Sequence, residues 1–259
     1  MSELLEDIRK YWTKRAKGYS EYNQGELSGE QREKWRQAIL AELPDKPLTE
    51  IHLLDVGTGP GFFAIILAEA GIQVTAVDYT EEMLKAAKAN AGELSEKIHF
   101  QQMDAQNLEF PDGTFDAVIT RNVTWNLEHP VRAYQEWYRV LKKDGVLLNF
   151  DANWYRYLCD EELRKGYEED RKKTKEQQVE DYYEGTDIAE MERIAAAVPL
   201  TEILRPAWDL HVMEEIGFQD CRSDETVNER ILSRADQING ESTPMSLVTG
   251  RKLKRVLNS

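Results

Sequence analysis

The sequence contains few of the residues that build disulfide frameworks or metal centres. Its 259 residues include two cysteines, Cys159 and Cys221, and four histidines. The cysteines lie in no Cys-x-x-Cys pattern, which argues against a disulfide framework, and we expect reduced structural thiols. No histidine has a partner at the spacing of metal ligands, so we predict that the protein holds no metal.

Long hydrophobic runs are also absent. No apolar stretch reaches the roughly 18–20 residues that a membrane-spanning helix needs. The N-terminal stretch MSELLEDIRKYW alternates in charge and has no apolar signal-peptide core. We therefore expect a cytoplasmic protein without a membrane partner.

Basic residues are outnumbered by acidic ones. The chain has 33 lysines and arginines against 48 aspartates and glutamates, which gives a formal net charge of −15. A protein that grips a nucleic-acid backbone normally presents a basic face, and binding to anionic membranes is disfavoured for the same reason. The acidity therefore argues against nucleic acid as a substrate and leaves a small molecule as the expected partner.

Strand-like and helix-like segments alternate through the middle of the chain, and 41% of the residues are hydrophobic, which allows a sizeable core. This alternation predicts a parallel sheet covered by helices on both faces. The predicted strands are residues 51–56, 73–77, 98–103, 115–120, 146–150, 218–227 and 245–252. The predicted helices between them are residues 62–69, 81–90, 130–141 and 208–216, with Thr80 as the cap of the second.

Two helical segments lie outside this alternation. Residues 1–44 are amphipathic and end in a proline-rich break. Residues 153–205 are charged, aromatic and too long for a plain connection between a strand and a helix. We therefore divide the chain into an N-terminal helical segment (1–44), the core of the sheet (45–152), a helical lobe inserted after the fifth strand (153–205) and the completion of the sheet (206–259).

The clearest motif follows the first predicted strand, where the sequence reads DVGTGPGF. Three glycines, Gly57, Gly59 and Gly61, let the backbone turn sharply and let a ligand approach without meeting a Cβ atom. The spacing differs from the dinucleotide fingerprint G-x-G-x-x-G, because Phe62 stands where the third glycine belongs. Asp55 beside the loop would repel a pyrophosphate but suits an amino group or a sulfonium. The motif therefore favours an amino-acid-bearing cofactor over NAD.

Carboxylates also follow the next two strands. Asp78 ends the second strand, 21 residues after Gly57, where an acid can accept hydrogen bonds from both hydroxyls of a ribose. Asp104 closes the third strand, where a carboxylate can accept a hydrogen bond from an adenine amino group. Arg121 and Asn122 arrive at the same edge from the fourth strand. A surface aspartate that precedes a helix is the alternative interpretation of Asp78.

These residues resemble the motifs of class I S-adenosylmethionine-dependent methyltransferases of the UbiE/COQ5-like small-molecule group. Residues 55–61, Asp78, Asp104 and Phe115-Asp116 fall where that group carries its motifs, and RVLKKDGVL at residues 139–147 is similar to its RVLKPGG element. The resemblance covers residues 50–152. It implies a Rossmann-like, doubly wound, seven-stranded sheet with an antiparallel last strand. It also implies S-adenosylmethionine as cofactor and S-adenosylhomocysteine as product.

The resemblance implies roles for single residues as well. Gly57 and Gly59 contact the methionine part, Asp78 the ribose, and Asp104 with Ala105 the adenine, against which Met83 packs. Tyr11 and Tyr19 resemble the aromatic residues of an N-terminal lid. The expected cofactor-binding residues are Asp55, Gly57, Thr58, Gly59, Gly61, Asp78, Tyr79, Met83, Asp104, Ala105, Arg121, Tyr11 and Tyr19.

Residues after the fourth and fifth strands are the candidates for binding a methyl acceptor. Asp151 is the candidate catalytic residue, because its carboxylate could pair with an amine or take its proton. The aromatic residues could wall a pocket, although a hydrophobic seam between sheet and lobe explains Trp154 equally well. Many relatives carry a histidine after strand four, but residues 122–127 contain none. The expected acceptor-binding residues are Asn122, Trp125, Asn126, Asn153, Trp154 and Tyr155.

The predicted function is S-adenosylmethionine-dependent methyl transfer to a nitrogen, oxygen or sulfur atom of a small molecule, by a monomer or a homodimer. The donor is already activated, so the reaction is a direct displacement that mainly requires alignment. The alternatives are a cofactor-binding protein without transferase activity and an NAD-dependent oxidoreductase. A nucleic-acid methyltransferase is disfavoured by the acidity and by the lack of an Asn-Pro-Pro-Tyr-like sequence after strand four.

Overall fold

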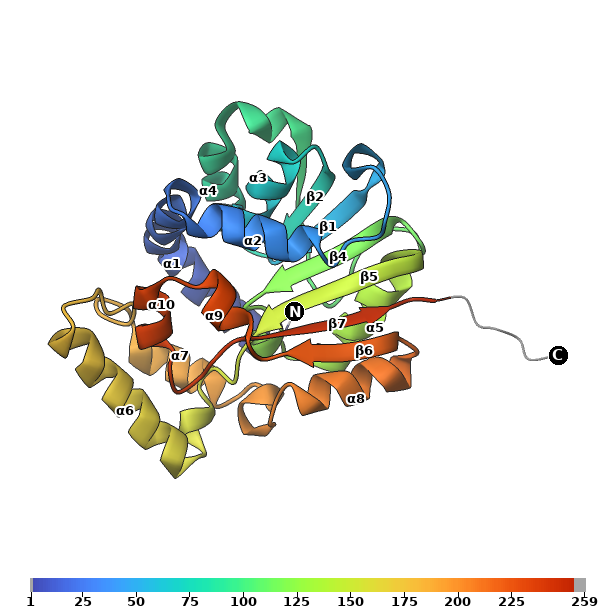
Figure 1. Ribbon diagram of the computed structural model, residues 1–259. Coiled ribbons are helices and arrows are strands. Elements are labelled where there is room, and N and C mark those ends of the chain that lie inside the picture. The colour runs from blue at the N-terminus through green and yellow to red at the C-terminus, as the bar shows by residue number, and fades with distance from the viewer. Residues whose placement is uncertain (1, 254–259) are drawn as a thin grey trace.

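The computed structural model describes residues 2–253 and shows a seven-stranded sheet with helices on both faces (Figure 1). The strand order is β3-β2-β1-β4-β5-β7-β6, and β7 runs antiparallel to both of its neighbours. The predicted Rossmann-like sheet with an antiparallel last strand is therefore confirmed. The strands are β1 (His52–Val56), β2 (Gln73–Asp78), β3 (Ile98–Gln102), β4 (Phe115–Arg121), β5 (Leu141–Asp151), β6 (Gln219–Asp224) and β7 (Ser246–Arg251).

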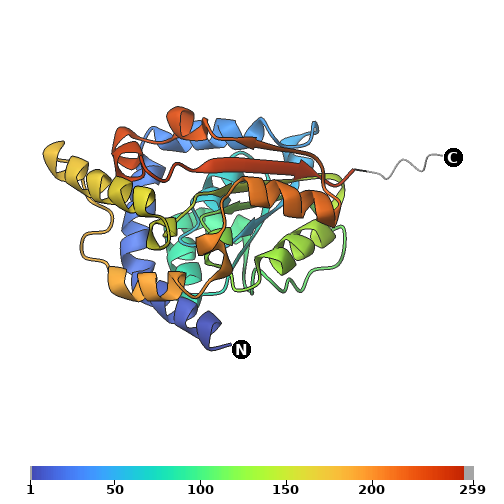
Figure 2. The ribbon, with the colours of Figure 1, turned by 90° about the horizontal axis from the view of Figure 1, so that it is seen from below.

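Helices cover the two faces of the sheet and its carboxyl end (Figure 2). The longer helices are α1 (Glu3–Ser28), α2 (Gln31–Leu40), α3 (Phe62–Glu69), α4 (Glu81–Ala91), α5 (Pro130–Val140), α6 (Glu161–Glu176), α7 (Ile188–Ala195), α8 (Ala207–Ile216), α9 (Val227–Ile231) and α10 (Arg234–Asn239). Short 3-10 turns are η1 (Leu48–Glu50), η2 (Gly92–Lys97), η3 (Thr124–Asn126), η4 (Arg156–Leu158) and η5 (Pro199–Glu202).

Two hydrophobic clusters, one on each face, hold the sheet between its helices. Helices α2, α3 and α9 bury their apolar residues in one cluster, and α5 and α8 bury theirs in the other. Trp35 of α2 is fully buried, and its ring lies 5.1 Å from that of Phe63 and 5.0 Å from that of Phe150. Strand β4 lies in the middle of the sheet and is buried up to Thr120, as its continuous apolar sequence indicates.

Two local predictions are wrong, and both errors involve side-chain hydrogen bonds near a turn. The predicted strand 218–227 ends at Asp224, whose Oδ1 accepts hydrogen bonds from Thr226 N (2.9 Å) and Thr226 Oγ1 (2.7 Å) and turns the chain into α9. Thr80 precedes α4 but makes no side-chain cap bond. Its backbone N–H donates instead to Asp78 Oδ1 at 2.8 Å.

The carboxyl end of the sheet carries the remaining helices. The arrowheads of β4 and β5 point toward α1, α7 and α10, which gather at that end with α6 beside them (Figure 1). Helix α1 packs on α4 and α7, and α6 packs on α10. Within residues 2–253, no helix has both the length and the apolar character that crossing a membrane requires. The arrangement places the ends of the parallel strands under a helical cover, where ligands bind in such sheets.

Candidate active site

The loop between β1 and α3 turns at three glycines, and each has a positive φ: 66° at Gly57, 52° at Gly59 and 92° at Gly61. At Gly59 a Cβ would lie 3.5 Å from the ring of Tyr19, an ordinary van der Waals contact, so this glycine faces the Tyr19 ring. At Gly61 a Cβ would lie 3.0 Å from the Cβ of Ala87 on α4. Gly57 and Gly59 line a cavity, whereas Gly61 packs on α4 and lies outside the cavity lining, contrary to expectation.

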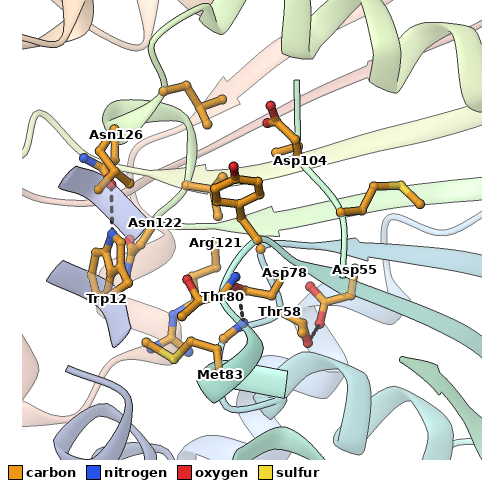
Figure 3. A pocket seen from close by; sticks show the side chains of 18 of the residues that line it. Trp12, Asp55, Thr58, Asp78, Thr80, Met83, Asp104, Arg121, Asn122 and Asn126 are labelled. Atoms are coloured by element: carbon orange, nitrogen blue, oxygen red, sulfur yellow. Dashed lines mark hydrogen bonds between the residues drawn. The ribbon is translucent and has the colours of Figure 1, made fainter. Parts of the chain in front are cut away.

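A cavity of about 140 Å³ lies beside this loop and brings two expected carboxylates together (Figure 3). Asp55 is 1% exposed, and its Oδ2 accepts a hydrogen bond from Thr58 Oγ1 at 2.6 Å. Asp78 accepts from Gly59 N at 2.9 Å and from Thr80 N at 2.8 Å, one bond to each oxygen. A carboxylate oxygen can accept more than one hydrogen bond, so Asp78 keeps capacity for a ligand.

Burial raises the pKa values of both carboxyl groups. The pKa of Asp55 is raised to about 7 by burial, although hydrogen bonds from Thr58 and from the backbone of Ala64 act in the opposite direction. The pKa of Asp78 is raised to about 6 for the same reason, against hydrogen bonds from Thr80 and Gly59. A nearby cation would favour the ionised carboxylates. A ligand with a positively charged group would therefore be attracted to these two carboxylates.

The far end of the cavity holds the residues that follow β3. Asp104 Oδ1 accepts from Gln106 N at 2.9 Å and from Gln106 Nε2 at 3.1 Å, and its Oδ2 receives no hydrogen bond from any residue between 2 and 253. Tyr79, Met83 and Ala105 line the same cavity, as expected. The strand ends thus place Asp55 near the loop, Asp78 in the middle of the cavity and Asp104 at its far end.

Arg121 lies where this cavity meets a second, larger one. Its Nη2 donates to Glu26 Oε1 at 2.8 Å, and its guanidinium lies 4.8 Å from the ring centre of Trp35. Burial lowers the pKa of Arg121, but Glu26, Tyr19 and Tyr22 together raise it above its usual value, so the group stays charged. The Nε atom is buried without a hydrogen-bond partner within the described residues, which leaves one donor for a ligand.

The second cavity has a volume of about 1060 Å³ and is lined by most of the predicted acceptor-binding residues. Trp125 and Trp154 are held by Asn122: Trp125 Nε1 donates to its backbone oxygen at 2.9 Å, and Trp154 Nε1 donates to its Oδ1 at 3.2 Å. Tyr155 stacks on Trp125 with ring centres 5.1 Å apart. Tyr11 lines this larger cavity only, while Tyr19 lines both.

Asp151 and Asn153 do not reach either cavity, which corrects their predicted contact with an acceptor. Asp151 is 2% exposed, and its Oδ2 accepts from Trp125 N at 2.9 Å and lies 2.9 Å from Arg205 Nη1. Its Oδ1 accepts from Ala152 N. Asn153 bonds the backbone N–H and oxygen of Arg205. The polar atoms of both side chains are therefore already bonded within the chain, where Asp151 holds Trp125 and Asn153 holds the backbone of Arg205.

The motifs of the sequence do not point to the residues of α1 other than its tyrosines, although Trp12 lines both cavities. Trp12 Nε1 donates to Asn126 Oδ1 at 2.8 Å, which draws Asn126 into the smaller cavity rather than toward an acceptor (Figure 3). Trp12, Tyr19 and Glu26 are each seven residues apart, which places them on one face of the helix. That spacing was the available signal, but it does not say which surface the face meets.

Comparisons with known proteins agree with this geometry. A family described as "Methyltransferase domain" matches residues 54–149, which contain the glycine loop and most of the region from β1 to β5. A demethylmenaquinone methyltransferase of Leptospira interrogans is 29% identical over 163 residues, covering 59% of this chain and 65% of that protein. A demethylmenaquinone methyltransferase of Deinococcus radiodurans is 40% identical over 121 residues, covering 45% of this chain and 49% of that protein. The matches thus span about half to two-thirds of these curated relatives.

A solved structure matches nearly the whole chain. A protein of Methanococcus maripaludis, assigned as an S-adenosyl-L-methionine-dependent methyltransferase, aligns with a TM-score of 0.61 over 95% of each chain, at 20% identity. At that identity the likeness concerns the fold. It extends the agreement beyond the residues that the family matches, to the helical segments at both ends.

Proposed function

Because the chain belongs to the class I S-adenosylmethionine-dependent methyltransferases of the UbiE-like type, we propose that it transfers a methyl group from S-adenosylmethionine to a nitrogen, oxygen or sulfur atom of a small molecule. One observation carries the proposal. Asp55, Asp78 and Asp104 follow successive strands around a single cavity, and a larger cavity adjoins it with room for an acceptor.

The residues near the loop suit the amino-acid end of the cofactor. Gly59 lines the smaller cavity, and the buried Asp55 carboxyl favours a cationic neighbour. The unpartnered Nε of Arg121 suits the carboxylate of the same amino acid. Asp78 retains acceptor capacity for the hydroxyls of a ribose.

The residues after β3 suit the base of the nucleoside. The Oδ2 of Asp104 is available for an adenine amino group, and Ala105 lies beside it in the lining. Met83 is 2% exposed and offers a thioether for packing against a ring face. Tyr79 completes this end of the cavity. The groups that line the smaller cavity thus occur in the same order as the amino acid, the ribose and the adenine of the cofactor.

We assign the remaining segments by position. Residues 45–152 hold the cofactor, residues 1–44 act as its lid, residues 153–205 form an acceptor lobe, and residues 206–259 complete the sheet as far as they are described. The smaller cavity, at about 140 Å³, is below the roughly 300–1,000 Å³ of typical ligand pockets. Since α1 lines it, an outward shift of α1 is the movement that would enlarge it for the cofactor.

When bound, the cofactor would supply an activated methyl group: the acceptor's lone pair would form a bond to the methyl carbon, and the electron pair of the broken carbon–sulfur bond would stay on sulfur, which leaves as the thioether of S-adenosylhomocysteine. The chain's contribution is to hold donor and acceptor in line and to exclude water. Trp125 and Tyr155 are placed to wall the acceptor next to the cofactor cavity. Asp151 acts through Trp125, whose backbone N–H it accepts.

Calorimetric titration of the purified chain with S-adenosylhomocysteine and with NAD tests the proposal. We expect the first to bind with a micromolar dissociation constant and the second to show no saturable heat. Binding of NAD alone would favour an oxidoreductase. If the cofactor binds but S-adenosylmethionine is not converted to S-adenosylhomocysteine with any tested acceptor, the result would favour a binding protein without transferase activity.

The remaining features of the proposal concern partners and compartment. The net charge of −15 supports a small-molecule acceptor over a nucleic acid or an anionic membrane. Both Cys159 and Cys221 are free thiols, in keeping with a cytoplasmic enzyme. We propose that it acts as a monomer or a homodimer.

A further inference from the structure

The larger cavity reaches from the strand ends to two segments that the cofactor motifs do not include. Its inner wall includes Trp125, Trp154 and Tyr155, together with α1. Its outer wall includes residues from 180–186 and from 225–245. Trp12, Tyr19, Arg121 and Asn122 line both cavities. A molecule in the larger cavity therefore lies next to a bound cofactor.

The lining of this cavity combines aromatic rings with negative charge. Nine tyrosine and tryptophan side chains and nine carboxylates line it, against two guanidinium groups, those of Arg15 and Arg121. Arg121 is already paired with Glu26 at 2.8 Å. Aromatic faces and carboxylates both attract cations. The lining therefore favours a positively charged molecule over a neutral or anionic one.

Four of these carboxylates have no basic side chain beside them. Glu180, Glu184, Glu225 and Glu229 lie on the outer wall, are exposed, and form no salt bridge with any residue between 2 and 253. The aromatic residues that follow β4 and β5 lie on the inner wall, next to the cofactor cavity. The four carboxylates without a salt bridge thus lie on the outer wall, where Tyr182 and Tyr183 also line the cavity.

A second and independent feature lies on the inner wall. Tyr11 is 6% exposed and lines the cavity, yet its hydroxyl makes no hydrogen bond within the part of the chain that the structure describes. Tyr155 and Asn122 both have left-handed backbones, with φ of 61° and 57°. Non-glycine residues seldom adopt this conformation, and it concentrates at ligand sites. An unpartnered hydroxyl in the lining of such a wall is available to a ligand with a polar atom.

We propose that the methyl acceptor is an organic amine that is positively charged at neutral pH, held with its ammonium group at the outer carboxylates and its reacting end among the aromatic residues of the inner wall. This inference rests on the proposed function, because the acceptor cavity is identified by its contact with the cofactor cavity. None of the four unpaired carboxylates lines the smaller cavity, so the inference predicts an acceptor whose charged group and reacting atom lie at different ends.

Matched pairs of probes test the inference by calorimetry on the full chain with S-adenosylhomocysteine present. The pairs are phenethylamine with 2-phenylethanol, and 1,6-diaminohexane with 1,6-hexanediol, which differ in charge but little in size. We expect at least one amine to bind at least tenfold more tightly than its alcohol, and this preference to weaken in high salt. If neither amine exceeds its alcohol, the inference is overturned. Failure of S-adenosylhomocysteine to bind would instead overturn the proposed function.

Variants on the outer wall provide the second test. The double substitution Glu184→Gln with Glu229→Gln should weaken amine binding by about fivefold and leave alcohol binding and S-adenosylhomocysteine binding unchanged. Glu96→Gln on η2, exposed and outside both cavities, is the matched control and should change none of the three. Both positions of the double variant are exposed, so folding should persist. An unchanged amine affinity in the double variant would contradict the assignment of the ammonium to this wall.

Discussion

The smaller cavity, which we assign to the cofactor, and the larger one, which we assign to the acceptor, differ in how their polar groups are held. In the cofactor cavity, Asp55 and Asp78 are anchored by hydrogen bonds from the loop that follows β1 or from residues near them in the chain. In the acceptor cavity, the carboxylates of residues 180–186 and 225–229 come from segments far apart in the chain, and four of them form no salt bridge with any residue between 2 and 253. Hydrogen bonds from nearby residues thus hold Asp55 and Asp78 in the first cavity, although α1 also lines it, whereas the carboxylates of the second depend on how distant segments pack. The first should tolerate little change and the second considerably more.

The largest expected effect concerns the buried ion pairs of Asp151, Arg205 and Asp209, next to Trp125 of the larger cavity. Asp151 lies 2.9 Å from Arg205, which also pairs with Asp209 at 2.7 Å, and all three are buried. Asp151→Ala leaves a buried guanidinium with one partner fewer, so the free energy of unfolding should fall by about 3 kcal/mol. Urea denaturation measures this, with Glu96→Ala as an unaffected control. Unchanged stability with lost methyl transfer would instead make Asp151 a catalytic residue.

A large effect confined to the cofactor cavity is expected from Asp78→Ala. Removal of an ionised acceptor for two hydroxyls should weaken S-adenosylhomocysteine binding about 100-fold, since each bond to a charged group contributes roughly 1.5–3 kcal/mol. Calorimetry provides the affinity, and the thermal midpoint serves as a control for folding because Asp78 also bonds Gly59 and Thr80. A loss below threefold would contradict the ribose assignment.

The affinity for the cofactor should depend on pH through the two buried carboxyl groups of the cofactor cavity. Burial raises the pKa of Asp55 to about 7 and that of Asp78 to about 6. Both groups are therefore protonated in acid and ionise as the pH rises, which strengthens their attraction for a cationic ligand. We expect affinity for S-adenosylhomocysteine to increase roughly tenfold from pH 5.5 to 7.5 and then level off.

Asp55→Asn provides the control for this titration. The variant removes the group with the higher pKa, so the upper part of the pH dependence should disappear and the part near pH 6 should remain. An identical pH profile in the variant and the parent protein would show that Asp55 does not face the cofactor's charge.

The smallest effect is expected where α1 meets the core. Trp12→Phe keeps an aromatic ring but removes the hydrogen bond to Asn126, so cofactor affinity should fall by no more than about fivefold, the equivalent of about 1 kcal/mol. Thr13→Val is the matched control, because its bond to Glu82 is long at 3.4 Å. An effect as large as that of Asp78→Ala would indicate that α1 forms the cofactor site rather than covering it.

Much of the cofactor cavity could be predicted from the sequence, because its groups follow strands that end at one edge. Asp55, Asp78 and Asp104 each lie at, near or just after the end of a strand, and parallel strands bring such residues together in any doubly wound sheet. Asp151 also follows that rule, which explains why it was chosen. The rule locates Asp151 but does not reveal its partners. Arg205 is too distant in the sequence for any local pattern to identify it as the ion-pair partner of Asp151.

The sequence by itself determined the order of the central strands and helices, the glycine loop and the carboxylates that surround it, because hydrophobic periodicity and local turn chemistry act over a few residues. The tertiary structure alone decided that Glu26 meets Arg121, that Trp12 meets Asn126, and that residues 180–186 and 225–245 close a cavity over the strand ends. Contacts between distant segments depend on packing geometry, which no local pattern encodes. The acceptor end of the site is built from such contacts, so it emerged only with the fold.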